Sequence, residues 1–213
     1  MPIPTPDTGS IACASADGAS CPPEPVAASS LTWRPPRKDL GACTAAQVSA
    51  FLDACINASS TTAACNAYIQ SDGGVRCFNC LYTDVTSTAF GPIVAGSTIE
   101  LLNTGGCIAL VDPCNIACAM VDEQGAVCSL ASCGSACAPD ASPSQQYADY
   151  LACANEATRC SCLGPHTALG ACANTLSSER SLAPCYGIGA SSFGSAVAAI
   201  AGLFCGNGSP DSG

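Results

Sequence analysis

Cysteine constrains this chain more than any other feature. Nineteen of its 213 residues are cysteine, a density typical of domains that disulfides hold together. Large apolar side chains are scarce, with five phenylalanines, one tryptophan and two methionines, and small side chains remove little apolar surface from water. The sequence therefore predicts a weak hydrophobic core reinforced by eight or nine disulfides, each typically contributing about 2–4 kcal/mol.

Cysteine usage and charge also indicate where the chain acts and what it does not bind. Disulfides persist in oxidising compartments, so we expect a secreted protein in the extracellular space or at the cell surface. The first residues have neither the basic nor the apolar region of a signal peptide, and we expect that a signal has been removed. The net charge of −10, with six basic residues, argues against nucleic acid as a partner, because phosphate binding requires clustered Lys and Arg.

Composition divides the chain into three predicted parts. Residues 1–40 are rich in Pro, Ser and Ala, which predicts a flexible tail, and residues 207–213 are predicted to be a disordered tail. Residues 41–206 form one disulfide-bonded helical domain. The stretch Trp33–Lys38 holds the single Trp and three of the six basic residues. It fits a docking strap or a processing site, but we favour a linker whose Trp packs onto the domain.

Helical signals recur through the predicted domain. Thr44 and Gln47 match a capping box ahead of apolar residues at helical spacing. Ser142 and Pro143 match an N-cap followed by a proline at the first helical position. The most apolar segment is too short for a transmembrane span, and we interpret it as a buried helix or one half of a subunit interface. The predicted helices are 44–56, 62–70, 143–160, 167–177 and 190–204, the last being this apolar segment.

One strand pair is predicted. Ile93–Ala95 and Thr98–Leu101 flank a two-residue turn at Gly96 and Ser97, a pattern typical of a hairpin. The fold class is therefore mainly α: a disulfide-rich, multi-helix domain with one small β-hairpin.

The spacing C-x3-C occurs twice, at Cys114–Cys118 and Cys133–Cys137. Residues four apart lie on one face of a helix, and Gly125 between the two motifs is a natural helix breaker. We therefore predict two antiparallel helices joined at Gly125, with a short turn over 107–111 before them. Two disulfides, Cys114–Cys137 and Cys118–Cys133, would join these helices.

Four other cysteines are predicted to form disulfides as well. Cys107 and Cys128 would tie the two helices to neighbouring helices. Cys77 and Cys80 have the C-x-x-C spacing of redox enzymes, but no βαβ pattern surrounds them and a structural role is favoured. Because nineteen is odd, at least one cysteine stays free, is modified or pairs with another chain; we expect it among Cys13, Cys21 and Cys205.

Two alternatives assign chemistry to the chain. Cys160, Cys162, His166 and Cys172 offer the ligand types of a zinc site, although their spacing matches no familiar motif and His166, the only histidine, is predicted to lie in a surface loop. An extracellular hydrolase would need two facing carboxylates. Nothing in the sequence marks such a pair among the candidates, which are Asp112, Asp122, Glu123, Asp149 and Glu156. No nucleophile motif, phosphate loop or cofactor site is present, which makes an enzyme the less favoured reading.

Short motifs add a resemblance. The cysteine pattern over 43–55, C-x-x-C-L at 77–81, F-G-P at 90–92 and G-G-C-I-A-L at 105–110 are similar to those of Cys-rich secreted proteins and lipoproteins abundant in myxobacteria. The resemblance covers residues 43–162 and implies an exported, disulfide-bonded protein without indicating an activity. The leading expectation is a non-enzymatic interaction or structural protein, able to self-associate through the odd cysteine, with an unknown ligand.

Overall fold

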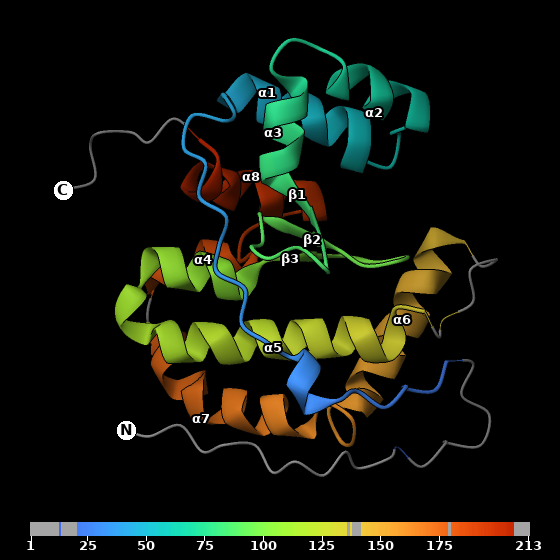
Figure 1. The fold of residues 1–213 in the computed structure, drawn as a ribbon, viewed down its shortest axis with the longest axis vertical. Helices are drawn as coiled ribbons and strands as arrows, with labels where there is room; N and C mark the ends of the chain where they lie inside the picture. Colours follow the sequence, from blue (N-terminus) through green and yellow to red (C-terminus); the bar gives the residue numbers. More distant parts are fainter. Residues whose placement is uncertain (1–12, 14–20, 136, 138–141, 179, 207–213) are drawn as a thin grey trace.

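The computed structural model describes residues 13, 21–135, 137, 142–178 and 180–206, and it is mainly α-helical and disulfide-rich, as predicted (Figure 1). Short strands form one small sheet. The helices are α1 (Ala45–Phe51), α2 (Thr62–Ile69), α3 (Gly74–Leu81), α4 (Thr104–Val111), α5 (Ile116–Cys133), α6 (Pro143–Ala157), α7 (Leu163–Ser178) and α8 (Phe193–Phe204), and the shorter helical turns are η1 (Ala28–Ser30), η2 (Leu52–Ile56), η3 (Pro113–Asn115) and η4 (Arg180–Tyr186).

The capping signals in the sequence are confirmed at two helices. At α1, the Gln47 N–H donates to Thr44 Oγ1 and the Thr44 N–H donates to Gln47 Oε1, so two N–H groups that the helix leaves unpaired are both satisfied. At α6, the Ser142 hydroxyl accepts the Gln145 N–H and Pro143 occupies the first turn. These interactions are local, which is why the sequence predicts both starts correctly.

The predicted hairpin is present within a larger sheet. Strands β2 (Ile93–Ala95) and β3 (Glu100–Leu102) pair antiparallel, with residues 96–99 between them instead of the predicted two-residue turn. A third strand, β1 (Tyr82–Asp84), follows α3 and pairs parallel with β2. The sequence did not predict β1, because three residues are too few to show the alternation of a strand.

The helical pair predicted at Gly125 is wrong. Helix α5 continues through Gly125 as a single helix of 18 residues, and its antiparallel neighbour is α4, a complete helix where only a short turn was predicted (Figure 1). Cys118 and Cys133 are fifteen positions apart on α5, about 22 Å at 1.5 Å per residue. A disulfide needs Cα atoms about 4.4–6.8 Å apart, so the two cysteines cannot pair.

The disulfides instead connect segments that are distant in the sequence. Eighteen cysteines form nine disulfides in the described part of the chain, and Cys114 is the free one. The disulfides are Cys13–Cys160, Cys21–Cys137, Cys43–Cys77, Cys55–Cys65, Cys80–Cys205, Cys107–Cys185, Cys118–Cys172, Cys128–Cys162 and Cys133–Cys153. Cys77 and Cys80 thus have structural partners, as expected. The expectation that the odd cysteine is Cys13, Cys21 or Cys205 is wrong.

The buried side chains form two clusters. The upper cluster, in the orientation of Figure 1, lies among α1, α3, α4 and α8 and contains Phe51, Ile108 and Phe204. Helix α8 is buried along one face, in agreement with its interpretation as a core helix. The lower cluster lies between the sheet, α5 and α6 and contains Phe90 and Leu130. None of the described helices combines the length and apolarity needed to cross a membrane.

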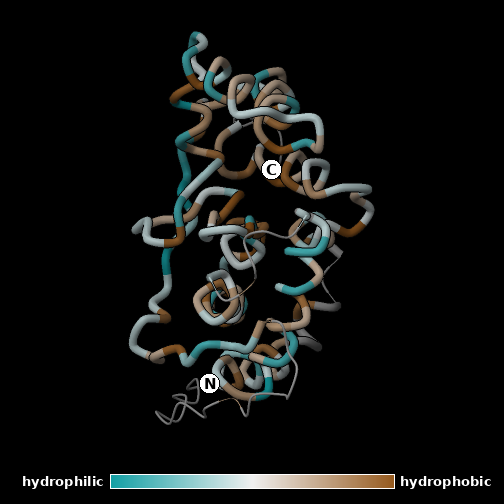
Figure 2. Tube along the Cα trace, turned by 90° about the vertical axis from the view of Figure 1, so that its right-hand side faces the viewer, coloured by the Kyte–Doolittle hydropathy of each residue, from teal (hydrophilic) through white to brown (hydrophobic). Residues whose placement is uncertain are grey.

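Residues 21–40, here called the strap, pack against the domain. The prediction of a flexible tail is therefore wrong for this range. Val26 and Leu31 are buried in the lower cluster, and Trp33 packs against the upper cluster, as favoured from the sequence. The strap passes from α5 towards α1 along one side of the molecule (Figures 1 and 2). The predictions for residues 1–12, 14–20 and 207–213 lie outside the described residues.

Candidate functional site

Glu123 is the ionisable side chain whose position most needs an explanation. It lies on α5 and only 3% of its surface is exposed. Oε1 accepts the main-chain N–H of Arg34 from the strap at 2.7 Å. Oε2 has no hydrogen-bond partner among the described residues. A buried carboxylate with one oxygen unpaired is costly, so this position is a candidate for a role beyond packing.

The close approach of two helices places Glu123 inside. It shares the inward stripe of α5 with Ala119 and Val127, which are also buried. Helix α4 packs against this stripe at Gly105, where an added Cβ would lie 2.5 Å from Ala119 O and 2.9 Å from Glu123 Cβ. Only glycine allows this approach, and the approach shields Glu123 from water.

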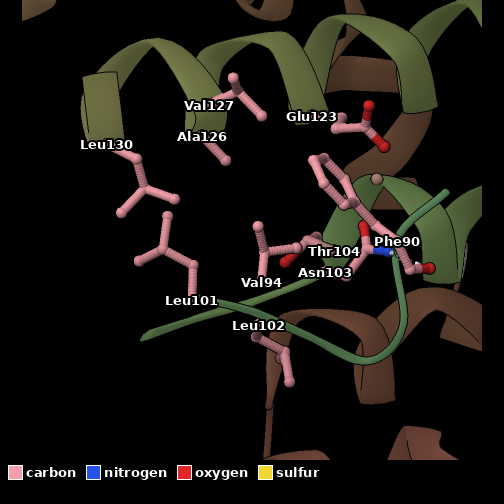
Figure 3. A pocket seen from close by; sticks show the side chains of 11 residues that line it. Phe90, Val94, Leu101, Leu102, Asn103, Thr104, Glu123, Ala126, Val127 and Leu130 are labelled. Carbon is pink, nitrogen blue, oxygen red and sulfur yellow. Dashed lines mark hydrogen bonds between the residues drawn. The ribbon is translucent and has the colours of Figure 1, made fainter. Parts of the chain in front are cut away.

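Glu123 faces a small cavity between α5 and the sheet (Figure 3). The cavity has a volume of about 10 Å³ and is lined mostly by apolar side chains, including Val94, Leu101 and Leu130. Such a volume holds about one water molecule. Asn103 also lines it, but its Oδ1 accepts the Gly106 N–H and its Nδ2 donates to two carbonyls. With room for about one water molecule, the cavity is too small for an organic substrate.

Burial dominates the electrostatics of this region. It raises the pKa of Glu123 to about 8, against the opposing effects of the Arg34 N–H and the Arg34 charge. Burial also raises the pKa of the neighbouring Asp122 to about 6. The Arg34 guanidinium does not pair with Glu123: its Nη1 donates to the Val85 carbonyl at 2.6 Å, and its Cζ lies 5.2 Å from the centroid of the Phe90 ring.

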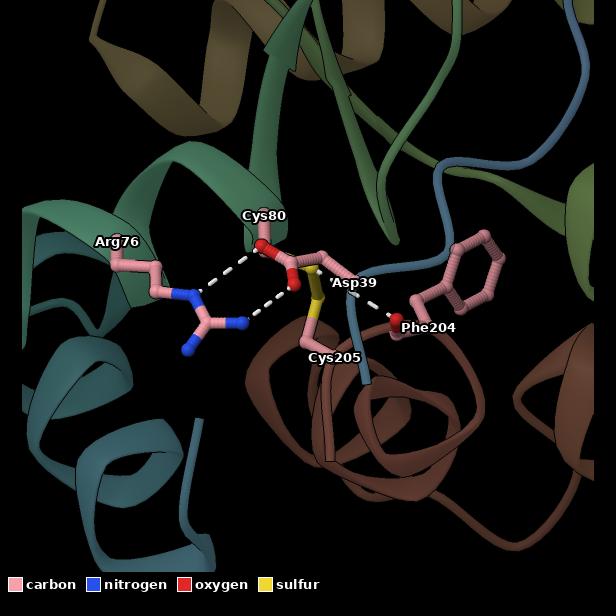
Figure 4. A network of polar contacts seen from close by, with 5 residues as sticks. All are labelled: Asp39, Arg76, Cys80, Phe204 and Cys205. Atoms are coloured by element: carbon pink, nitrogen blue, oxygen red, sulfur yellow. Dashed lines mark hydrogen bonds and ion pairs between the residues drawn. A yellow bond between two sulfur atoms is a disulfide. The ribbon is translucent and has the colours of Figure 1, made fainter. Parts of the chain in front are cut away.

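A second, more open hollow lies where the strap meets α3. Arg37, Asp39 and Arg76 line it, and its volume is about 430 Å³. Asp39 Oδ1 accepts Arg76 Nη2 at 2.6 Å, and both side chains are substantially exposed. Beside this pair lies the Cys80–Cys205 disulfide, which joins α3 to the end of α8 (Figure 4). Water and salt screen exposed ion pairs, so the disulfide is the stronger connection here.

The candidate zinc ligands from the sequence do not form a site. Cys160, Cys162 and Cys172 belong to three different disulfides, and a disulfide sulfur cannot act as a thiolate ligand. His166 lies exposed on α7, not in the predicted loop. The zinc alternative is therefore contradicted.

One other group of sulfur atoms lies close together. The Sγ atoms of Cys21, Cys137 and Cys153 are within 4.8 Å of one another. They belong to the adjacent disulfides Cys21–Cys137 and Cys133–Cys153. This group is the packing of two disulfides, with no thiolate available to a metal.

The candidate carboxylates do not form the pair that a glycosidase requires. Of the five, only Glu123 lines either of the two hollows, and its cavity cannot admit a sugar. Asp122 is its sequence neighbour, close enough for its charge to raise the pKa of Glu123. Glu123 is one of the five carboxylates considered from the sequence, but no local sequence signal distinguishes it from the other four. The reason is that its burial depends on contacts with α4 and the strap.

Cys114 is the remaining reactive group. It lies in η3, the turn between α4 and α5, and it is exposed. The prediction that it pairs with Cys137 is wrong, because Cys137 binds Cys21. A free, accessible thiol can form a disulfide with another chain.

The described residues thus define a disulfide-bonded, mainly α-helical domain with a packed strap, one buried carboxylate and one exposed thiol. Comparison with protein-family models, with curated proteins and with solved structures finds no match.

Proposed function

We propose that this chain is an exported, non-enzymatic protein that acts through protein–protein contacts in the extracellular space or at the cell surface. The observation that carries the proposal is the pairing of eighteen of the nineteen cysteines across the described chain. Such a framework is stable where thiols are oxidised and is rare in a reducing cytosol. The acidic charge, −10 overall, favours solubility in such a setting. The resemblance to exported myxobacterial proteins points the same way and remains part of the proposal.

Counting the free thiols tests the framework. We expect intact-mass measurement of the monomer, after alkylation of the folded protein without reductant, to show one modified cysteine, and peptide mapping to place it at Cys114, which is the exposed free thiol. After reduction and unfolding, all nineteen should react. Four or more reactive cysteines in the folded, oxidised protein would overturn the disulfide framework, and with it the argument for export.

We further propose that Cys114 supports self-association. A disulfide between two copies through Cys114 would use the one thiol that the fold leaves accessible. On a non-reducing gel, we expect a dimer that reductant converts to monomer and that is absent from Cys114→Ser. Because Cys114 is exposed, this substitution should change the unfolding free energy by less than about 0.5 kcal/mol. Monomer alone after air oxidation of the wild-type protein would count against self-association through this thiol.

A further inference from the structure

The strap is fixed at both ends and crosses α5 between them. At one end, the Cys21–Cys137 disulfide holds it. At the other end, the Arg37 N–H donates to the Phe90 carbonyl at 2.7 Å, and Cys43 follows with its disulfide to Cys77. Movement of the strap is therefore restricted to the stretch between these attachments.

The Phe90 N–H also donates to the Pro35 carbonyl at 3.0 Å, which fixes Pro35 together with Arg37. The stretch before it, residues 31–34, has few polar attachments to the rest of the described structure. The Gln124 side chain donates to the Leu31 carbonyl at 3.0 Å, and the Arg34 guanidinium donates to the Val85 carbonyl. The third attachment is the bond from the Arg34 N–H to Glu123 Oε1. It is the one of these three that involves an ionisable acceptor. Ionisation strengthens this bond but also leaves a charge buried, so the balance of the two effects decides whether the strap stays closed.

The closed strap penalises a charge on Glu123. The carboxylate is buried, Glu123 lines a cavity with room for about one water, and no described group donates to its Oε2. Lifting residues 31–34 would let water reach both oxygens, and hydration favours the charged form. Closure therefore favours the protonated carboxyl, and ionisation favours opening.

We propose that Glu123 is a proton-operated latch, which holds residues 31–34 against α5 when protonated and lets them open when ionised, while the two ends of the strap stay attached. Opening withdraws Leu31 from the lower cluster, where it is buried. The latch thereby couples pH to the exposure of an apolar part of the protein surface.

The charged groups around Glu123 set the direction of the effect. From the strap, Arg34 lowers the pKa of Glu123 through its N–H and its charge, and from α5 itself Asp122 raises it. The parts of α4 and the sheet that line the cavity bring no titratable side chain to it. Burial outweighs these influences and raises the pKa of Glu123 to about 8. The contribution of Glu123 to closing the strap is therefore fully present at pH values below the ordinary pKa of a glutamate. It is lost as the pH rises to about 8.

Amide hydrogen exchange measured by NMR tests the latch within the strap. The chain provides an internal comparison, because the Arg34 N–H is bonded to Glu123 and the Arg37 N–H to a carbonyl. From about pH 5 to about pH 8, after correction for intrinsic exchange, we expect the protection factor of Arg34 to fall about a hundredfold and that of Arg37 by less than about threefold. In Glu123→Gln, the protection of Arg34 should change by less than about threefold over the same range.

Asp122→Asn is the matched control. It removes the neighbouring carboxylate and should preserve the hundredfold fall at Arg34. The proposal fails if wild-type Arg34 protection is independent of pH, if Arg37 loses protection equally, if Glu123→Gln keeps the full pH dependence, or if Asp122→Asn abolishes it. The wild-type titration can overturn the proposal by itself, so the test does not depend on the folding of a variant.

Discussion

Removing the Cys80–Cys205 disulfide by the double substitution Cys80→Ala and Cys205→Ala is expected to lower the free energy of unfolding by about 3–5 kcal/mol. This disulfide closes a segment of 125 residues and attaches the end of α8 to α3. Both cysteines are almost completely buried, so lost packing adds to the greater freedom of the unfolded chain. Guanidinium unfolding followed by far-UV circular dichroism, without reductant, measures the change.

The Cys55–Cys65 disulfide is the matched control for this prediction. It closes only 10 residues, between η2 and α2, and its cysteines are half-buried. Replacing both with Ala should cost about 2–3 kcal/mol. If the two double variants lose the same stability, disulfide stabilisation in this protein does not depend on the length of chain that is closed.

Glu123→Gln is expected to stabilise the protein at neutral pH. The folded pKa of Glu123, about 8, exceeds that of an exposed glutamate, so folding disfavours the charged form. Stability from this group is fully present below about pH 4 and is lost progressively as pH rises towards about 8. Gln keeps an oxygen for the Arg34 N–H without the charge, and we expect it to gain about 2–3 kcal/mol at about pH 7.

The pH dependence makes this prediction specific. At about pH 4 both proteins carry a neutral group at residue 123, and their unfolding free energies should agree within about 0.5 kcal/mol. Glu156→Gln is the control, because Glu156 forms an exposed ion pair with Arg159 at the C-terminal end of α6, and it should change stability little at either pH. Urea unfolding at the two pH values measures all three proteins, and an equal effect of Glu123→Gln at both values would contradict the ionisation of a buried carboxyl.

The starts of two helices could be predicted from the sequence. Thr44 and Gln47 predict the start of α1, and Ser142 and Pro143 that of α6, because a capping bond joins residues at most three positions apart. By contrast, α5 runs straight through Gly125. A glycine in a helix costs about 1 kcal/mol relative to alanine, and the packing of α5 against α4, α6 and α7 outweighs that local cost.

The candidate site was only partly visible in the sequence. Glu123 was one of five carboxylates without a distinguishing signal, because its burial depends on the approach of α4 at Gly105 and on the strap contact at Arg34. Cys114 was expected to pair with Cys137, because the C-x3-C spacing suggested two helices where one forms. The burial of Glu123 and the pairing of Cys137 with Cys21 both depend on contacts between residues that are distant in the sequence.

By itself, the sequence determined the class of this protein: a disulfide-rich, mainly helical domain with a small hairpin, whose scarce large side chains call for covalent reinforcement. Only the tertiary structure decided which cysteines pair, where the strap lies and which carboxyl is buried. The physical reason is distance. Composition, capping and periodicity act within a few residues of the chain, whereas a disulfide or a buried charge depends on which surfaces meet after the helices have packed.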